Sequence, residues 1–175
     1  MIKKTKRGQM EISFQLIFSL ILIAAFIYAA FVGIRYFMAS ADLAKINNFI
    51  VDLKGDVENA YMTTEVSKSY DYSLPSRIKW VCFSAQNTLT AGLLNSAPSE
   101  CSQFETYLSS FKNMNMFFCP PEGAWKVKAP IYASIDCRGK ECLDFVKNPY
   151  CIRNTEGKVT ISLEKNFGDP KIKLK

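Results

Sequence analysis

Six cysteines carry most of the chemistry that this 175-residue sequence could perform. They are Cys82, Cys101, Cys119, Cys137, Cys142 and Cys151. Zinc sites built from cysteine use spaced pairs such as C-x-x-C, often with histidine partners, and the chain has neither that spacing nor any histidine. Disulfides are therefore the favoured use. Six cysteines allow fifteen connectivities, which spacing does not resolve. A bond between Cys137 and Cys142 would close a small loop around Arg138, Gly139 and Lys140.

The sequence contains few combinations of residues that could catalyse a reaction. Asp136, Glu141 and Asp144 could form a pair of acid–base carboxylates, but surface carboxylates commonly lie this close in sequence. Without histidine there is no Ser-His-Asp triad and no base for a reactive cysteine. A glycine-rich phosphate loop is also missing. We therefore expect no enzyme activity, no catalytic residue, no bound metal and no cofactor.

The basic charge is concentrated at the start of the chain. Four basic residues precede residue 9: Lys3, Lys4, Lys6 and Arg7. The net charge of +6 minus 4 leaves +2 for the rest. Near the end, Lys171, Lys173 and Lys175 alternate with Ile172 and Leu174, which is typical of a strand with one charged face. Lysines there would discourage pairing between exposed strand edges, and we favour this interpretation over nucleic-acid binding.

A long uncharged run indicates a membrane helix. It extends from Ile12 to Ile34, enough at about 1.5 Å per residue to cross a hydrocarbon core of about 30 Å. Basic residues before such a run tend to stay in the cytoplasm, so everything after Arg35 should lie outside the cell, where disulfides form. A cleaved secretory signal is the alternative. Ala39, Ser40 and Ala41 would then precede a cut before Asp42, but such signals have apolar regions of only about 7–15 residues.

The junction between the basic residues and the apolar run resembles a known processing signal. Basic residues followed by Gly8, Gln9 and the acidic Glu11 resemble the class III signal peptide of archaeal type IV pilins. The resemblance covers about the first 40 residues. It implies cleavage by a prepilin peptidase between Gly8 and Gln9, retention of the helix, and assembly with copies of itself or other pilin-like subunits. Many members carry the acidic residue at the fifth mature position, whereas Glu11 would be the third.

Glu11 needs a charged partner or a polar location, whether or not the chain is processed like a pilin. A carboxylate costs about 2.5 kcal/mol or more at the centre of a bilayer. It could pair with the free amine that cleavage creates on Gln9 of a neighbouring subunit, or lie among lipid headgroups beside Arg7. Further along, Ala25, Ala29 and Gly33 recur at every fourth position. Such small residues let membrane helices approach closely, although they are also common in membrane helices without an interface.

The helix is expected to continue beyond the membrane. From Asp42 to Val66, apolar residues follow the three-and-four spacing of an amphipathic helix. They are Leu43, Ile46, Phe49, Ile50, Leu53, Val57, Ala60 and Tyr61. No proline intervenes before Pro75, so we expect one helix from about Met10 to Val66. Its first half suits lipid or a helical bundle and its second half suits a folded domain. A coiled-coil stalk is disfavoured because no heptad pattern is sustained.

Residues 67–175 are polar and rich in turns, and their number suits one domain. Phe104, Tyr107, Leu108 and Phe111 predict a short helix over Cys101–Phe111. Strands are expected at Ile78–Phe83 with Trp80 and Cys82 on one face, at Met116–Cys119, within Trp125–Ile135 with a break at Pro130, and at Ile172–Leu174. Tyr150–Arg153 and Val159–Leu163 should form a hairpin.

The sequence therefore predicts an α+β fold. A long N-terminal helix, membrane-spanning in its first half and amphipathic in its second, packs on a small antiparallel β-sheet domain with disulfides. The expected layout is a leader at 1–8, a helix at 9–66 with its transmembrane segment at about 12–34, and an extracytoplasmic domain at 67–175. The favoured function is a pilin-like filament subunit. Many archaeal pilins, the family that the chain resembles, carry N-x-S/T sequons, so their absence here favours a minor or pseudopilin-like subunit. The alternative is a membrane-anchored adhesion or receptor domain that does not polymerise.

Overall fold

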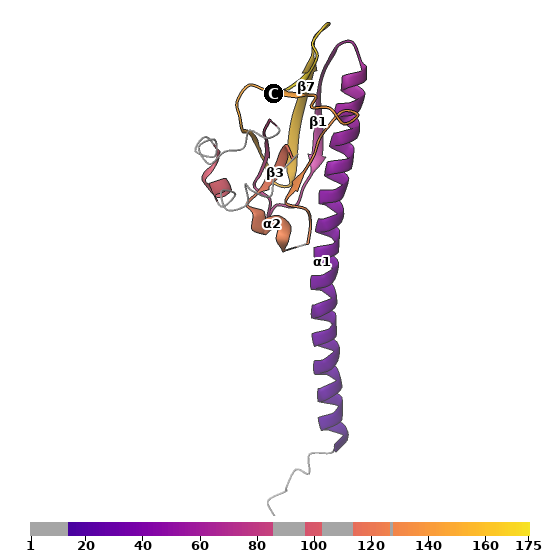
Figure 1. Cartoon of the computed structure of the whole chain (residues 1–175). Helices are drawn as coiled ribbons and strands as arrows, with labels where there is room; N and C mark the ends of the chain where they lie inside the picture. Colours follow the sequence, from indigo (N-terminus) through magenta and orange to yellow (C-terminus); the bar gives the residue numbers. More distant parts are fainter. Residues whose placement is uncertain (1–13, 86–96, 103–113, 127) are drawn as a thin grey trace, which may run out of the picture. The chain divides into compact units, whose positions relative to one another are not determined.

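The computed structural model describes residues 14–85, 97–102, 114–126 and 128–175 (Figure 1). Residues 1–13, which include the predicted leader at 1–8 and the predicted site residues Gly8, Gln9 and Glu11, lie outside the described residues. The chain divides into two compact units, and the boundary falls between Met38 and Ala39. The second half of the long helix therefore belongs to the same unit as the strands. One long N-terminal helix, mainly antiparallel sheets and three disulfides confirm the predicted α+β class.

Helix α1 (Phe14–Met62) ends four residues earlier than expected. Its last turn contains no basic residue of its own, although the final carbonyls of a helix need donors and favour positive charge. Lys165, from a strand distant in sequence, supplies both the hydrogen-bond donor and the positive charge. Its Nζ donates to the carbonyl oxygens of Tyr61 at 2.7 Å and Thr63 at 2.8 Å. The chain then turns into the strand β1 (Val66–Ser73), which was not expected from the sequence.

The second unit contains two four-stranded sheets. The first contains, in spatial order, β1 (Val66–Ser73), β7 (Lys158–Lys165), β8 (Ile172–Leu174) and β5 (Leu143–Phe145). The second contains β4 (Tyr132–Ala133), β3 (Met116–Cys119), β2 (Trp80–Phe83) and β6 (Tyr150–Arg153). All neighbouring strands are antiparallel except β5 and β8.

The predicted hairpin is wrong in its pairing. The chain turns between β6 and β7, with positive φ angles at Glu156 and Gly157, but the two strands join different sheets. Buried Asn154 explains the separation. Its Nδ2 donates to the carbonyl oxygens of Pro75 at 3.0 Å and Ile78 at 2.7 Å. These bonds hold the end of β6 beside the segment that leads into β2.

Two other expectations meet different outcomes. The strand expected within Trp125–Ile135 is present but short: the two-residue β4 follows Pro130, and the short helix α2 (Pro121–Trp125) ends at the first residue of this segment. Gly123 lets α2 pack closely, because a Cβ there would lie 2.8 Å from the Arg77 carbonyl oxygen. Of the helix expected over Cys101–Phe111, residues 99–102 form a 3₁₀ turn and residues 103–111 lie outside the described part of the chain.

The interpretation of the C-terminal lysines as edge protection is also wrong. Strand β8 lies inside its sheet, between β7 and β5. The lysines around it instead form ion pairs: Lys171 with Glu141, Lys173 with Asp169, and Lys175 with Glu164. Alternation predicts a strand with one charged face, but it does not distinguish an edge from an interior position.

The core forms where α1 meets both sheets. The buried side chains of α1 are Ile46, Phe49, Leu53, Val57 and Ala60. Phe49 packs edge-on against Tyr72 of β1 at a ring distance of 5.3 Å and against Phe118 of β3 at 5.8 Å. The amphipathic pattern predicted for this half of the helix therefore describes its packing correctly.

Candidate membrane span, disulfide cluster and surface groove

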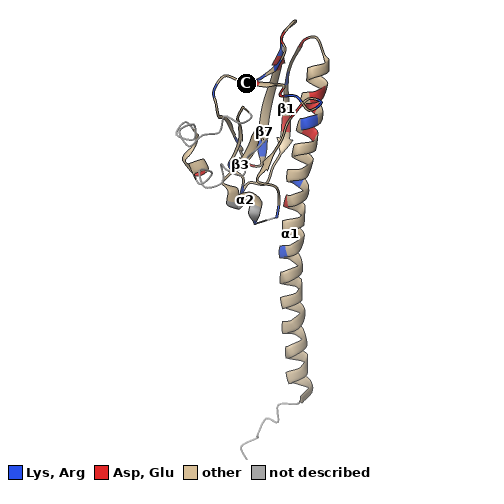
Figure 2. Cartoon of the chain, viewed as in Figure 1, with Lys and Arg blue, Asp and Glu red and all other residues tan. Residues whose placement is uncertain are grey.

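Residues 14–38 of α1 expose their apolar side chains. The exposed fractions include 82% for Phe14 and 73% for Phe37. The only charged residue in this part is Arg35, whose guanidinium lies 4.4 Å from the centre of the Phe31 ring. Figure 2 shows the contrast with the charged second half of the helix. By length and composition α1 could cross a membrane, with a mean hydropathy of 2.6 in its most apolar part. One long apolar N-terminal helix is consistent with a single membrane span.

The predicted small residues lie within this part of α1. Ala25, Ala29 and Gly33 are exposed, and a Cβ on Gly33 would meet open space. A second helix could therefore approach this side closely, and its packing there stays a prediction. Ala39, Ser40 and Ala41, the alternative cleavage signal, also lie inside α1.

All six cysteines form disulfides, which confirms the favoured interpretation. Cys82 bonds to Cys151, which lies directly opposite on the neighbouring strand β6. Cys101 bonds to Cys119 and ties the 3₁₀ turn to the end of β3. Cys137 bonds to Cys142 and closes the suggested small loop. The first two pairings connect residues far apart in sequence, so they could not be chosen before the strand register was known.

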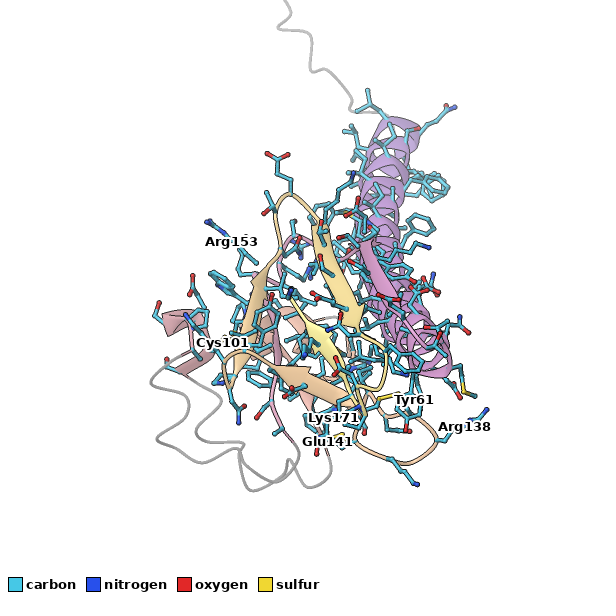
Figure 3. The ribbon with its side chains drawn as sticks, turned by 90° about the horizontal axis from the view of Figure 1, so that it is seen from above. Tyr61, Cys101, Arg138, Glu141, Arg153 and Lys171 are labelled. Atoms are coloured by element: carbon cyan, nitrogen blue, oxygen red, sulfur yellow. A yellow bond between two sulfur atoms is a disulfide. The ribbon has the colours of Figure 1, made fainter. Side chains whose placement is uncertain are left out.

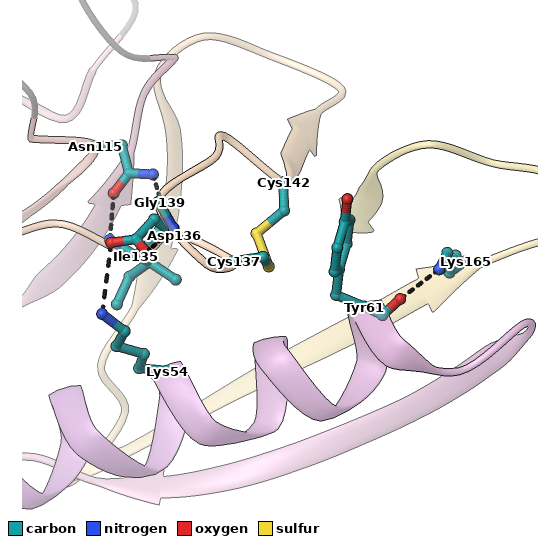
Figure 4. The surroundings of a disulfide bond; sticks show 9 residues. All are labelled: Lys54, Tyr61, Asn115, Ile135, Asp136, Cys137, Gly139, Cys142 and Lys165. Atoms are coloured by element: carbon teal, nitrogen blue, oxygen red, sulfur yellow. Dashed lines mark hydrogen bonds and ion pairs between the residues drawn. A yellow bond between two sulfur atoms is a disulfide. The ribbon is translucent and has the colours of Figure 1, made fainter.

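The small loop is a tight, positively charged turn. Cys137 and Lys140 exchange two backbone hydrogen bonds of 3.0 and 3.1 Å, and Arg138 and Gly139 between them adopt positive φ. The Asp136 carboxylate accepts from the Gly139 amide at 3.0 Å and pairs with Lys54 of α1 (Figure 4). The side chains of Arg138 and Lys140 are exposed, so the disulfide presents two cations on a constrained turn.

The carboxylates considered for catalysis have separate structural roles. Asp136 supports the small loop, and Glu141 pairs with Lys171 at 3.3 Å (Figure 3). Asp144 accepts from the amide of Phe145, the next residue in the chain, at 3.0 Å. In the described part of the chain, these three carboxylates do not lie close enough together to bind one metal ion.

Two of the disulfides lie against each other. Cys82 Sγ is 3.7 Å from Cys101 Sγ, and the sulfur atoms of Cys82, Cys101 and Cys151 all lie within 4.8 Å of one another. Cys82, Cys101 and Cys119 are fully buried, whereas Cys151 is partly exposed. We call these four residues the disulfide cluster. With every sulfur bonded, the cluster has no thiolate with which to bind a metal.

A groove opens beside the exposed end of the disulfide cluster. It has a volume of about 710 Å³, within the range of about 300–1,000 Å³ that is usual for ligand sites. We name it the Trp80 groove after its largest side chain; it is lined by Trp80, Ala97, Pro98, Ser99, Glu100, Val146, Lys147, Pro149, Tyr150 and Cys151. The lining comes from several segments that are separated in sequence, so no local sequence pattern predicts the groove.

The polar groups of the Trp80 groove are held in place by neighbours. Hydrogen bonds from its own backbone amide, then from the Ser99 hydroxyl and the Trp80 indole, keep the pKa of the Glu100 carboxyl below its usual value. Burial raises the pKa of the Tyr150 hydroxyl. Arg153 lies 5.9 Å from the centre of the Trp80 ring. The groove thus combines aromatic surface with a carboxylate that stays ionised.

Comparison with known proteins gives no match, whether to protein-family models, to curated protein sequences or to solved structures.

Proposed function

We propose that this protein is a pilin-like structural subunit of an archaeal type IV pilus-like surface filament. The observation that carries the proposal is the division of α1. The helix is apolar and exposed over residues 14–38, and from Ile46 onward it is amphipathic and packed on a disulfide-bonded β domain. A long N-terminal apolar helix packed on a small β domain with disulfides fits a pilin-like architecture. The exposed apolar part needs lipid before assembly and a bundle of other helices after it.

The proposed pathway assigns a role to each part of the chain. The basic leader stays in the cytoplasm until a prepilin peptidase cuts between Gly8 and Gln9. The apolar part of the helix then leaves the bilayer and packs among neighbouring helices, with Ala25, Ala29 and Gly33 at close contacts. Glu11 pairs with the Gln9 amine of an adjacent subunit. The disulfide-bonded domain faces the exterior, where its bonds persist.

The second candidate is a membrane-anchored adhesion or receptor domain that does not polymerise. The Trp80 groove favours it, because aromatic side chains beside ordered polar groups are common in binding sites. In this alternative α1 is a permanent anchor and the leader is retained. A groove of this kind could also serve an assembled subunit, so we rank the anchor second.

The N-terminal residue of the protein purified from its native membrane separates the two candidates. We expect intact mass and peptide sequencing to find a chain that starts at Gln9. A chain that retains Met1 would overturn the filament proposal in favour of the anchor. A start at Asp42 would mean a secreted domain without a membrane helix.

A matched substitution then tests assembly separately from processing. Glu11→Ala should still be cleaved and should leave the disulfide-bonded domain folded, but its incorporation into filaments should fall at least about tenfold, because a buried amine would lose its partner. Glu11→Gln keeps the size of the side chain and removes the charge, so it should show the same defect. Normal incorporation of both variants would refute the pairing between Glu11 and Gln9.

A further inference from the structure

We infer that the disulfide cluster is a thiol–disulfide exchange site, entered through the Trp80 groove at Cys151. The co-reactant would be a thiolate, either from a small thiol or from the reactive cysteine of a dithiol oxidoreductase. This inference is independent of whether the protein forms filaments.

The access to the cluster is asymmetric. Cys151 lines the Trp80 groove and is partly exposed, whereas its partner Cys82 is fully buried. Exchange requires direct attack on a sulfur atom, so an incoming thiolate can reach Cys151 but not Cys82. The groove contains both Lys147, a cation of the kind that stabilises a thiolate, and the ionised Glu100 carboxylate. Val146, which is 73% exposed, adds an apolar contact surface at the same opening.

The position of the second disulfide provides a second exchange step after the first attack. The incoming thiolate forms a mixed disulfide with Cys151 and releases Cys82 as a thiolate. Cys82 Sγ is 3.7 Å from Cys101 Sγ, close enough to attack it with little movement. That step forms a Cys82–Cys101 bond and releases Cys119 as a thiolate. Each step breaks one S–S bond and forms another, so electrons balance and the net result is one mixed disulfide and one free thiol.

The third disulfide supplies an internal control. Cys137 and Cys142 are both buried, and in the part of the chain that the structure describes no third cysteine lies near them. Removing Cys151 leaves the Cys82 thiol beside a second disulfide. Removing Cys142 leaves the Cys137 thiol without a neighbouring disulfide, so the two variants can be compared.

The test uses the full-length chain in detergent, mapped by mass spectrometry of acid-quenched peptides. In Cys151→Ser, we expect Cys82 to exchange, so that a substantial fraction of molecules carries a Cys82–Cys101 bond and a free thiol at Cys119. In Cys142→Ser, both remaining native bonds should stay intact and Cys137 should be the free thiol. A Cys151→Ser map with Cys82 free and Cys101–Cys119 intact would overturn the inference.

The unmodified chain provides a second measurement that needs no substitution. After brief treatment with reduced glutathione, the first adduct should be on Cys151 and should accompany the Cys82–Cys101 bond. Adducts that appear first on Cys137, Cys142 or Cys119 would contradict the proposed entry point. The same reaction with thioredoxin distinguishes the two sources: a rate per thiol at least about tenfold above that of glutathione identifies a protein partner, and a similar or lower rate identifies a small thiol.

Discussion

Tyr72 connects the core of the domain to the acidic side of α1. Its ring packs against Phe49, and its hydroxyl donates to the Asp56 carboxylate at 2.8 Å. Burial first, and then the hydrogen bond and charge of Asp56, raise the pKa of the Tyr72 hydroxyl well above its usual value of 10.0. The folded chain thus keeps this proton at a pH where the unfolded chain loses it. The resulting stabilisation is full below the unfolded pKa and is lost as the pH rises toward the folded pKa.

Tyr72→Phe should separate the contribution of the hydrogen bond to Asp56 from the contribution of the raised pKa of the hydroxyl. At about pH 8 the variant should be less stable by about 1 kcal/mol, because Asp56 loses a hydrogen bond. Between about pH 9 and pH 11 its free energy of unfolding should fall less steeply than that of the unchanged chain, since a phenylalanine side chain cannot ionise in the unfolded state. Urea unfolding of the full chain in detergent measures both. Tyr70→Phe removes a hydroxyl from the same strand as a control, and parallel pH profiles for the unchanged chain and Tyr72→Phe would contradict the prediction.

Among the elements, periodicity predicted α1 best and the strand pairings worst. The spacing of Ile46, Phe49, Leu53 and Val57 identifies the buried face because one helix has one period. Strand pairing depends on contacts between distant residues, and local alternation contains no record of them. The sequence of the turn after Arg153 is typical of a hairpin. The hydrogen bonds from Asn154 to Pro75 and Ile78 nevertheless hold β6 in a different sheet from β7. The same non-local register determines that Cys82 meets Cys151, which is why only the short Cys137–Cys142 loop could be suggested in advance.

The packing of α1 on the sheets predicts a large effect for one core substitution. Phe49 contacts both sheets, so Phe49→Ala should reduce the free energy of unfolding by about 3–5 kcal/mol. Val51→Ala, at a position that is 68% exposed on the same helix, should change it by less than about 0.5 kcal/mol. Loss of the near-ultraviolet circular dichroism signal on heating the full chain in detergent reports on this unit. Equal effects of the two substitutions would mean that α1 is not packed on the sheets as described.

Considered as a whole, the second unit carries opposite charges on the two sides of α1. Asp52 and Asp56 of α1 line a groove of about 430 Å³ with Asp71 of β1, and among the described residues none of the three has an ion-pair partner. On the other side, Lys54 and Tyr61 face the small loop that presents Arg138 and Lys140 (Figure 4). Asp52 and Lys54 are two positions apart, which is about 200° around an α-helix.

This charge asymmetry gives the filament proposal a testable contact. When the acidic side of one copy meets the small loop of the next, the contact is heterologous, and heterologous contacts that do not close produce helical filaments. Complementary charges would mainly determine partner and register. Arg138→Glu together with Lys140→Glu should therefore reduce filament yield at least about tenfold at low salt, with the disulfides and the monomer fold unchanged.

Charge reversal on the opposite side should restore the contact. Asp52→Lys with Asp71→Lys leaves the Asp56–Tyr72 bond in place, and these substitutions combined in one chain with the two loop substitutions should recover filaments in sedimentation and electron microscopy. Lys126→Glu with Lys128→Glu makes the same change in net charge at exposed positions beyond α2 and should assemble normally. If reversal at the loop leaves assembly unchanged, the contact is refuted because the loop charges do not matter. If the control pair is equally defective, the contact is refuted because net charge alone accounts for the data.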